Sequence, residues 1–292
     1  MYLSFYGLNE KPFNSTPDPR FLYLSPGHQE ALAQLQYGIL ERKGFMVLTG
    51  KVGTGKTTVL QTLRRRLAGD TAVSYVFHTL PFDGLLCYVL EDLGITEPDE
   101  SRVRRLIALN KFLIERERAG QNTVLIIDEA QNLDAATLEQ IRLLSNFETA
   151  TSKLLQIVLA GQPELKAKLD LPELRQLKQR VVLACQIPLL IPQEVPEYIR
   201  RRLRVAGAHD RNLFNEFAVD RITKYCGGIP RVINILGDHC LVFGYVNYKR
   251  RIDLQAVNQA IEYLEESIAS PRRILSLGGW RPRRHFQVGS LG

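Results

Sequence analysis

Eight consecutive residues, Gly50 to Thr57, combine the residue types that bind nucleotide phosphates. The three glycines of this run let the backbone adopt conformations that other residues resist, so several N–H groups can point at one phosphate. Lys56 is placed to reach the β- and γ-phosphates, and the Thr57 hydroxyl is placed to coordinate Mg²⁺. The expected nucleotide-binding residues are Gly50, Lys51, Val52, Gly53, Thr54, Gly55, Lys56, Thr57 and Thr58.

Two acids close a buried apolar run further along the chain. Residues 124–127 are apolar, and Asp128 and Glu129 follow them directly. Such a run is typical of a strand buried on both faces, and open α/β sheets bind ligands at the carboxyl ends of their strands. Alone, the pair could equally be a solvated turn. Together with the loop at 50–57, it predicts that Asp128 binds Mg²⁺ and the nucleotide, and that Glu129 is the general base for ATP hydrolysis.

Strands and helices alternate around these residues. An apolar strand leads into the loop at Gly50, and a helix continues from Thr57, which is the strand–loop–helix context that the motif requires. The alternation predicts an α/β fold in which helices cover both faces of a five-stranded parallel sheet. The expected strands are 44–49, 73–78, 123–128, 154–160 and 180–187, and the expected helices include 56–67, 101–118 and 135–147.

Strand signals stop after Pro188 and Pro192, and helical spacing follows. The residues at 12–19 are too rich in proline for regular structure, and a helix is expected to start near Pro26. Further helices are expected near 193–206, 213–225, 230–247 and 254–267. The expected domains are a nucleotide-binding domain at 1–190 that includes the proline-rich segment, a helical lid at 191–268 and a basic flexible tail at 269–292.

The composition is globular, with 45% apolar and 24% charged residues. The net charge is +7, and residues 271–292 supply five of these charges through arginines without any acid. Such a tail could bind nucleic acid, acidic lipid or a protein, or it could be a solvated terminus. The sequence shows neither the long apolar run of a membrane helix nor a signal peptide, which predicts a cytoplasmic protein. The four scattered cysteines favour buried free thiols over zinc or disulfides.

Several separated motifs resemble one protein family. The extra strand between the loop and the acids, together with the helical region after the sheet, resembles AAA+ ATPases. More narrowly, the chain is similar to the ExeA/GspA ATPases from residue 1 to about 268. This resemblance implies a P-loop AAA+ core, an all-helical lid, and ATP and Mg²⁺ as cofactors. The motifs that carry it are FYGLNEKPF at 5–13, TPDPRFLY at 16–23, DEAQN at 128–132 and GQPEL at 161–165.

The same resemblance implies roles for polar residues near the strand ends. In AAA+ proteins a polar residue after the fourth strand senses the γ-phosphate, and Gln162 stands there in place of the commoner asparagine. An arginine near the start of the last strand reaches into the neighbouring subunit's site and stabilises the transferring phosphoryl group. Arg180 is the best match for this arginine, and Arg175 is the alternative.

The lid adds a further motif. GGIPRVIN at 227–234 resembles the second sensor of Cdc6-like lids, in which Arg231 would face the nucleotide. Phe13 is expected near adenine, as residues ahead of the loop often are in AAA+ proteins. His28 is expected to be a helix-start residue and not a ligand. A solvated helix face is the default interpretation of the basic cluster Arg200, Arg201, Arg202 and Arg204.

These features predict an ATPase that acts at subunit interfaces of a homo-oligomeric ring or filament and drives assembly or remodelling of a partner complex. ExeA/GspA proteins couple this module to a membrane helix and a peptidoglycan-binding domain, but this sequence ends about 24 residues after the last expected helix with neither. A protein partner at the membrane or in a secretion or export machine is therefore expected. The alternative is a regulator of DNA transposition of the TnsC and MuB sort, which would bind duplex DNA through the arginine-rich tail and the ring interior.

Overall fold

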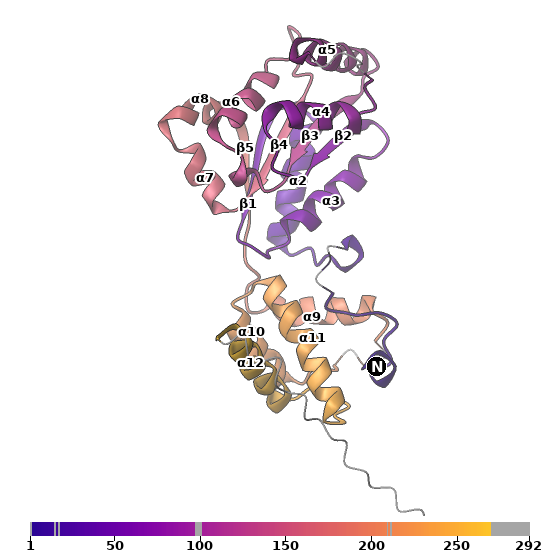
Figure 1. Ribbon diagram of the computed structural model, residues 1–292. Coiled ribbons are helices and arrows are strands. Elements are labelled where there is room, and N and C mark those ends of the chain that lie inside the picture. The colour runs from indigo at the N-terminus through magenta and orange to yellow at the C-terminus, as the bar shows by residue number, and fades with distance from the viewer. Residues whose placement is uncertain are drawn as a thin grey trace, which may run out of the picture.

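The computed structural model describes residues 2–14, 16, 18–96, 101–208, 210 and 212–269. Five parallel strands form the sheet of the upper lobe in Figure 1, in the order β2-β3-β4-β1-β5. Every strand begins and ends within two residues of its expected bounds, so the predicted five-stranded parallel sheet is confirmed. The strands are β1 Phe45–Gly50, β2 Thr71–Val76, β3 Asn122–Ile127, β4 Gln156–Gly161 and β5 Val181–Ile187.

The two faces of the sheet are buried under different helices. Alternate residues of β1, such as Met46 and Leu48, pack with α2 and α3, whereas Phe45 and Val47 pack with α4, α6 and α7. A central strand that is buried on both faces reads as a continuous apolar run, which explains the sequence of β1, β3 and β4. The helices of this lobe are α2 Pro26–Leu40, α3 Lys56–Leu67, α4 Phe82–Asp92, α5 Arg102–Arg118, α6 Ala135–Leu144, α7 Pro163–Leu169 and α8 Arg175–Arg180, with short 3₁₀ turns at Pro19–Phe21, Ala130–Asn132 and Pro172–Leu174.

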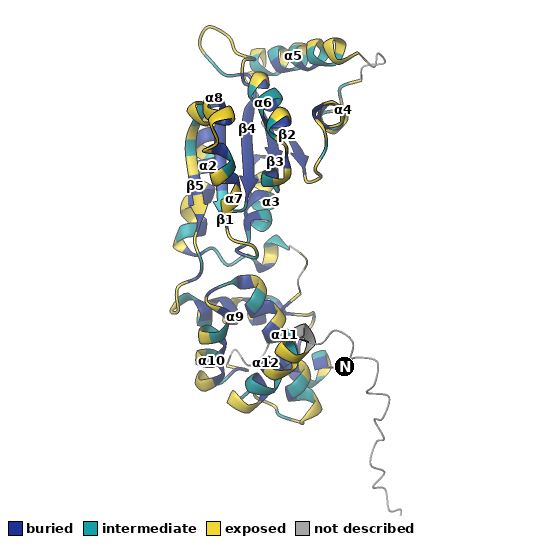
Figure 2. Ribbon diagram, turned by 60° about the vertical axis from the view of Figure 1, so that its left-hand side comes forward, coloured by how far each residue is buried: buried dark blue, intermediate teal, exposed yellow. Residues whose placement is uncertain are grey.

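The second lobe is helical, as predicted (Figure 1). Asn215 accepts the N–H of Ala218 and caps the helix Glu216–Cys226, just as Ser25 caps α2 in the first lobe. Figure 2 shows that the inner faces of these helices are buried and their outer faces exposed. The helices are α9 Glu194–Val205, α10 Glu216–Cys226, α11 Pro230–Val246 and α12 Leu254–Ala269.

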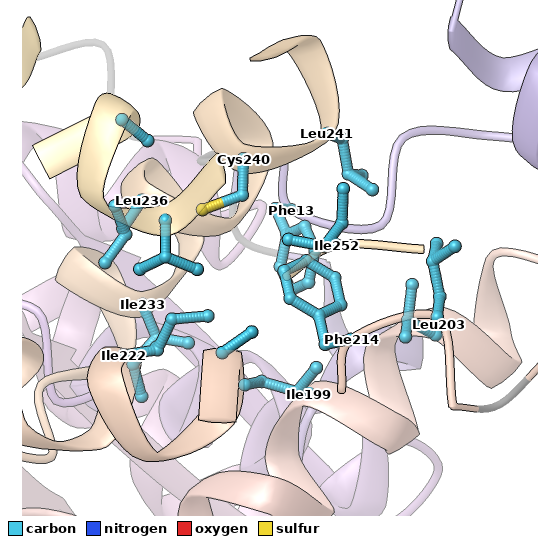
Figure 3. Close-up of a cluster of buried hydrophobic side chains, with 14 of the residues drawn as sticks. Phe13, Ile199, Leu203, Phe214, Ile222, Ile233, Leu236, Cys240, Leu241 and Ile252 are labelled. Carbon is cyan, nitrogen blue, oxygen red and sulfur yellow. The ribbon is translucent and has the colours of Figure 1, made fainter. Parts of the chain in front are cut away.

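The N-terminal segment belongs with the helical lobe by its packing. It begins with the short helix α1 Tyr2–Tyr6, and Tyr6 and Phe13 are buried in the core of that lobe. Figure 3 shows the rings of Phe13 and Phe214 next to each other. They meet edge to face, with centroids 5.8 Å apart. The expected nucleotide-binding domain at 1–190 includes this segment, and the segment's apolar side chains pack on the lid helices.

No helix in the described ranges combines the length and apolar character that crossing a bilayer requires. The tail from residue 270 onward, to which the sequence analysis assigned most of the positive charge, lies outside the described residues.

Candidate functional site

The glycine-rich loop lies between the carboxyl end of β1 and the first turn of α3. Gly55 is the N-cap of α3 and has no side chain to occupy the helix N-terminus, which leaves the N–H groups of the first turn available to an anion. Gly53 lies in the left-handed region with φ of +78°, and an added Cβ would lie 2.6 Å from the Cβ of Arg231. The loop therefore leaves N–H groups open to an anion and is also the point where the lid approaches the sheet.

Lys56 is folded back on this loop. Its Nζ donates to the carbonyl oxygens of Gly50 at 2.8 Å and of Lys51 at 3.3 Å, and the residue is only 5% exposed. Burial lowers the pKa of Lys56, while the nearby carboxylates of Glu129 and Asp128 act in the opposite direction. A partly desolvated cation at a helix N-terminus is suited to a negatively charged phosphate.

Asp128 lies next to Thr57, although the two are 71 residues apart in the chain. The Thr57 hydroxyl donates to Asp128 Oδ2 at 2.9 Å, and the Tyr75 hydroxyl donates to the same oxygen at 2.9 Å. The other carboxylate oxygen accepts the backbone N–H of Glu129 at 2.9 Å. Thr57 and Asp128 thus supply the oxygen donors that Mg²⁺ prefers, directly beside the phosphate loop, and they fit this ion.

Tyr75 also belongs to this site, although it is not among the expected site residues. It stands on β2, whose residues pair in register with β3, and Tyr75 lies opposite Ile126. Burial raises the pKa of the Tyr75 phenol, and the Asp128 carboxylate raises it further, so the hydroxyl remains a donor. No local motif marks this residue, because its role depends on which strand lies beside β3.

Glu129 lines the same cavity as the loop. Its backbone is left-handed, with φ of +53°, at the turn between β3 and the 3₁₀ turn Ala130–Asn132. Gln131 Nε2 donates to Glu129 Oε2 at 2.6 Å, and Gln162 Nε2 donates to the same oxygen at 3.3 Å. The structure therefore brings the expected general base and the expected γ-phosphate sensor together, and it adds Gln131.

The cavity has a volume of about 360 Å³ and lies between the two lobes. One wall is the phosphate loop with the start of α3. A second wall comes from the N-terminal segment and a third from the lid, so all three parts of the described chain meet at it. Its lining residues outside the loop include Asn14, Asp18, Phe21, Tyr23, His28, Glu129, Leu190, Tyr198, Arg202, Arg231 and Asn234.

Two expectations about this cavity are corrected. Phe13 does not line it but lies 2% exposed in the core of the helical lobe, because it packs on Phe214. Phe21 and Tyr23 line the cavity in its place. The second correction concerns Arg202 in the basic cluster, which is 7% exposed and not part of a solvated face.

Arg202 joins the N-terminal segment to the lid. Its guanidinium donates to the carbonyl oxygens of Pro12 and Asn14, the latter at 3.0 Å, and to the Tyr198 hydroxyl at 3.2 Å. It also lies over the ring of Phe21, 4.8 Å from its centroid. Its neighbours Arg200, Arg201 and Arg204 are exposed, as expected.

His28 stands in the first turn of α2, as expected, and also touches the phosphate loop. Its Nε2 lies 2.9 Å from the carbonyl oxygen of Thr54, and its Nδ1 lies 2.6 Å from the Ser25 hydroxyl. Since a carbonyl only accepts, Nε2 carries the proton and Nδ1 accepts from Ser25. Burial lowers the pKa of His28, which favours this neutral form. His28 is thus a second residue beside the nucleotide loop that spacing alone does not identify.

The expected arginines occupy different places. Arg231 lines the cavity from the first turn of α11, and its N–H donates to the carbonyl oxygen of Gly53 at 3.1 Å. Arg180 ends α8, where its guanidinium donates to Asn146 Oδ1 at 3.2 Å, and it is not among the residues that line the described cavity. Arg175 begins the same helix and is exposed. Of these three expected arginines, Arg231 alone lines the described cavity of its own chain.

The strand order, the loop after β1 and the acids after β3 define a P-loop AAA+ core followed by an all-helical lid. Residues 39–169 match the AAA domain family. The chain is 40% identical over 254 residues to General secretion pathway protein A of Aeromonas hydrophila, which confirms the expected resemblance. That match covers 86% of this chain but 46% of the relative, so the chain spans about half the length of that protein.

Solved structures agree with this fold. Cdc6p from Pyrobaculum aerophilum superposes with a TM-score of 0.66 at 18% identity, covering 85% of this chain and 71% of that one. The Aeropyrum pernix ORC2 protein, solved as ADPNP–ADP complexes, gives a TM-score of 0.65 at 16% identity, with 89% and 72% covered. Because the sequence identity is so low, these similarities establish the fold alone.

Proposed function

We propose that this protein binds ATP with Mg²⁺ and hydrolyses it. The observation that carries the proposal is the convergence of Lys56, Thr57 and Glu129 on one cavity, with Asp128 hydrogen-bonded to Thr57. A phosphate cradle, an oxygen pair suited to Mg²⁺ and a carboxylate beside them are the parts that phosphoryl transfer to water needs.

The chain's own residues then have distinct tasks. Lys56 exchanges its two carbonyl partners for the β- and γ-phosphates, and the loop N–H groups bind the remaining phosphate oxygens. Thr57 and Asp128 hold the Mg²⁺, which neutralises charge between the phosphates when bound. Glu129 orients the attacking water and accepts its proton. Gln162, whose amide reaches the Glu129 carboxylate, senses the γ-phosphate.

The site is proposed to work between subunits of a homo-oligomer, a ring or a filament. Arg231 supplies a lid contact from within the chain, whereas Arg180 is bonded to Asn146, is not among the residues lining its own chain's described cavity, and would serve a neighbour. An arginine supplied in trans makes hydrolysis depend on assembly. We assign residues 1–190 to nucleotide binding and 191–268 to the lid, with the N-terminal segment docked on the lid.

We further propose that hydrolysis drives assembly or remodelling of a partner complex at the cytoplasmic side of a secretion or export machine. This part of the proposal rests on the 40% identity to General secretion pathway protein A. We expect the partner to be a protein at the membrane or in the export machine.

The decisive variant is Glu129→Gln, which keeps the size of the side chain and removes the base. We expect unchanged binding of a fluorescent ATP analogue and a loss of phosphate release of about 100-fold or more. Glu173→Gln is the matched control, because Glu173 is exposed and is not among the residues that line the described cavity. Turnover by Glu129→Gln at the wild-type rate would remove the general-base assignment.

Duplex DNA is the competing partner, and assembly distinguishes the two. The protein with Mg²⁺ and a slowly hydrolysed ATP analogue is mixed with duplex DNA, and complex size is followed by light scattering at rising salt. The proposal expects no DNA-dependent assembly. Assembly that weakens steeply with salt would instead favour a DNA-binding regulator.

A further inference from the structure

Two sequence motifs that lie about 30 residues apart meet beside the cavity. DEAQN follows β3 and GQPEL follows β4, and these strands are neighbours in the sheet. Gln131 Oε1 accepts the backbone N–H of Gln162 at 3.1 Å. A Cβ at Gly161 would lie 2.6 Å from that same oxygen, so glycine at this position makes room for the Gln131 side chain. The two motifs therefore form one structural unit, with Gln131 as the bridge.

The other end of the Gln131 amide holds the expected general base. Its Nε2 donates to Glu129 Oε2 at 2.6 Å, and Gln162 Nε2 donates to the same oxygen at 3.3 Å. Among the described residues, no other hydrogen bond reaches the Glu129 carboxylate. Glu129 Oε2 is thus held by two amides, and Glu129 Oε1 is left to accept a proton from water in the cavity.

The turn that carries Gln131 is itself held from α7. Lys168 Nζ donates to the carbonyl oxygens of Gln131 and Leu133, each at 2.6 Å. Ala130, between Glu129 and Gln131, is fully buried. The left-handed backbone of Glu129 is costly for a residue with a side chain, so these contacts must hold it in place.

We propose that Gln131 is a positioning residue for Glu129. The Gln131 amide hydrogen-bonds one carboxylate oxygen of Glu129 and the backbone N–H of Gln162. The other carboxylate oxygen, Glu129 Oε1, is thereby held in a fixed orientation to accept a proton from water. The inference rests on the proposed role of Glu129. It adds that the rate of the chemical step depends on a residue that is not among those lining the described cavity.

The first test compares Gln131→Ala with Asn132→Ala, its exposed neighbour on the same turn. We expect kcat of Gln131→Ala to fall by about 10-fold, since a loosened base loses part of its 10²- to 10⁴-fold contribution. KM for ATP and binding of a fluorescent ATP analogue should stay within about twofold. Asn132→Ala should resemble the wild type. An equal loss in both variants, or a loss confined to KM, would overturn the proposal.

A second variant separates positioning from packing. Gln131→Glu keeps the shape but sets a carboxylate against Glu129, and repulsion moves the base when both are charged. We expect kcat of Gln131→Glu to fall by about 10-fold or more, while KM for ATP stays within about twofold. Turnover of Gln131→Glu at the wild-type rate would argue for a merely structural role.

A double-mutant cycle completes the test in single-turnover phosphate release. If Gln131 acts through Glu129, Gln131→Ala has no further effect once Glu129→Gln is present. Equal losses in both backgrounds would show that Gln131 acts elsewhere and overturn the inference. A wild-type rate for Glu129→Gln alone would instead overturn the proposed function, so the two failures are distinguishable.

Discussion

The backbone of Arg231 lies directly on the phosphate loop, because its N–H donates to the carbonyl oxygen of Gly53 at 3.1 Å. A second contact of the same kind lies just before it, where the Leu190 N–H donates to the carbonyl oxygen of Gly228 at 3.0 Å. The start of α11 is thus joined to the nucleotide loop and to the chain segment that leaves the sheet. A shift of bound phosphate at the loop would therefore reach the lid through peptide groups.

Gly228 is the position where this connection is most sensitive. It has φ of +75°, and an added Cβ would lie 2.0 Å from the carbonyl oxygen of Leu190. We expect Gly228→Ala to lower the free energy of unfolding by about 2–3 kcal/mol through backbone strain and the clash. Urea denaturation followed by circular dichroism measures this change.

Gly227 is the matched control for Gly228. It is also left-handed, with φ of +53°, but its added Cβ would meet no atom within 4 Å. Gly227→Ala should therefore cost only the backbone strain of about 1 kcal/mol. Equal costs for the two variants would show that the contact with Leu190 does not constrain the lid.

Tyr75→Phe tests the support of the Mg²⁺ site. The change removes one of the donors to Asp128 Oδ2 and leaves Thr57 in place. Outer partners of metal ligands are worth about 10- to 100-fold in metal affinity, so the Mg²⁺ concentration for half-maximal turnover should rise by about 10-fold. Titration of ATPase activity with MgCl₂ at saturating ATP measures it.

The Tyr75 effect should not depend on pH. Burial and the Asp128 carboxylate raise the pKa of the phenol, so it stays protonated through the neutral and mildly alkaline range. The ratio of Mg²⁺ requirements between variant and wild type is therefore expected to be constant from about pH 6 to about pH 9. An unchanged Mg²⁺ requirement would mean that Thr57 and the Glu129 N–H position Asp128 without Tyr75.

The sheet could be predicted from the sequence because β1, β3 and β4 are buried on both faces and read as apolar runs. The deviations follow from neighbouring segments. β2 starts two residues before its expected position because Thr71 and Ala72 pair with β3. β4 starts two residues late because Leu154 is hydrogen-bonded instead to the carbonyl oxygen of Phe147.

The site residues that belong to contiguous sequence motifs could be predicted from the sequence. Gly50 to Thr57 and the acids after β3 are contiguous motifs with fixed geometry. The residues that were missed act across the fold. Tyr75 reaches the site because β2 pairs with β3, and His28 reaches it because α2 lies beside the loop. Gln131 contacts Gln162 because β4 lies beside β3. No pattern in a single sequence shows which strands or helices are neighbours, although the DEAQN and GQPEL motifs include Gln131 and its partner Gln162.

His28 gives the structure a dependence on pH. Burial lowers the pKa of this imidazole below its ordinary value of about 6.5, so the unfolded chain binds the proton more readily than the folded one. The stability from neutral His28 is complete above pH of about 6.5 and is lost as pH falls through the lower folded value. Wild-type Tm should therefore decrease between about pH 7.5 and about pH 5.5.

His28→Gln should reduce this decrease by roughly 2–4 °C, because glutamine does not titrate and can still donate to Thr54. Differential scanning calorimetry at the two pH values measures the change. His78→Gln is the control, since His78 is exposed. Should both variants keep the wild-type pH dependence, His28 is not the titrating group in this window.

Arg180 supports the strongest prediction about assembly. It lies at the end of α8, bonded to Asn146, and does not line the described cavity of its own chain. If it completes a neighbour's site, Arg180→Ala should lower turnover by about 100-fold or more without weakening ATP binding. Lys56→Ala should be inactive for a different reason, because its own loop lacks the phosphate-binding cation.

Mixing the two variants tests whether Arg180 acts in a neighbouring subunit. An equimolar mixture of Arg180→Ala and Lys56→Ala places an intact Lys56 next to an intact Arg180 at roughly a quarter of interfaces, and phosphate release should recover to that extent. Arg175→Ala, at the exposed start of the same helix, is the control and should behave as wild type. Recovery with Arg175→Ala instead would move the trans assignment to Arg175, and no recovery with either would place the arginine's action within one subunit.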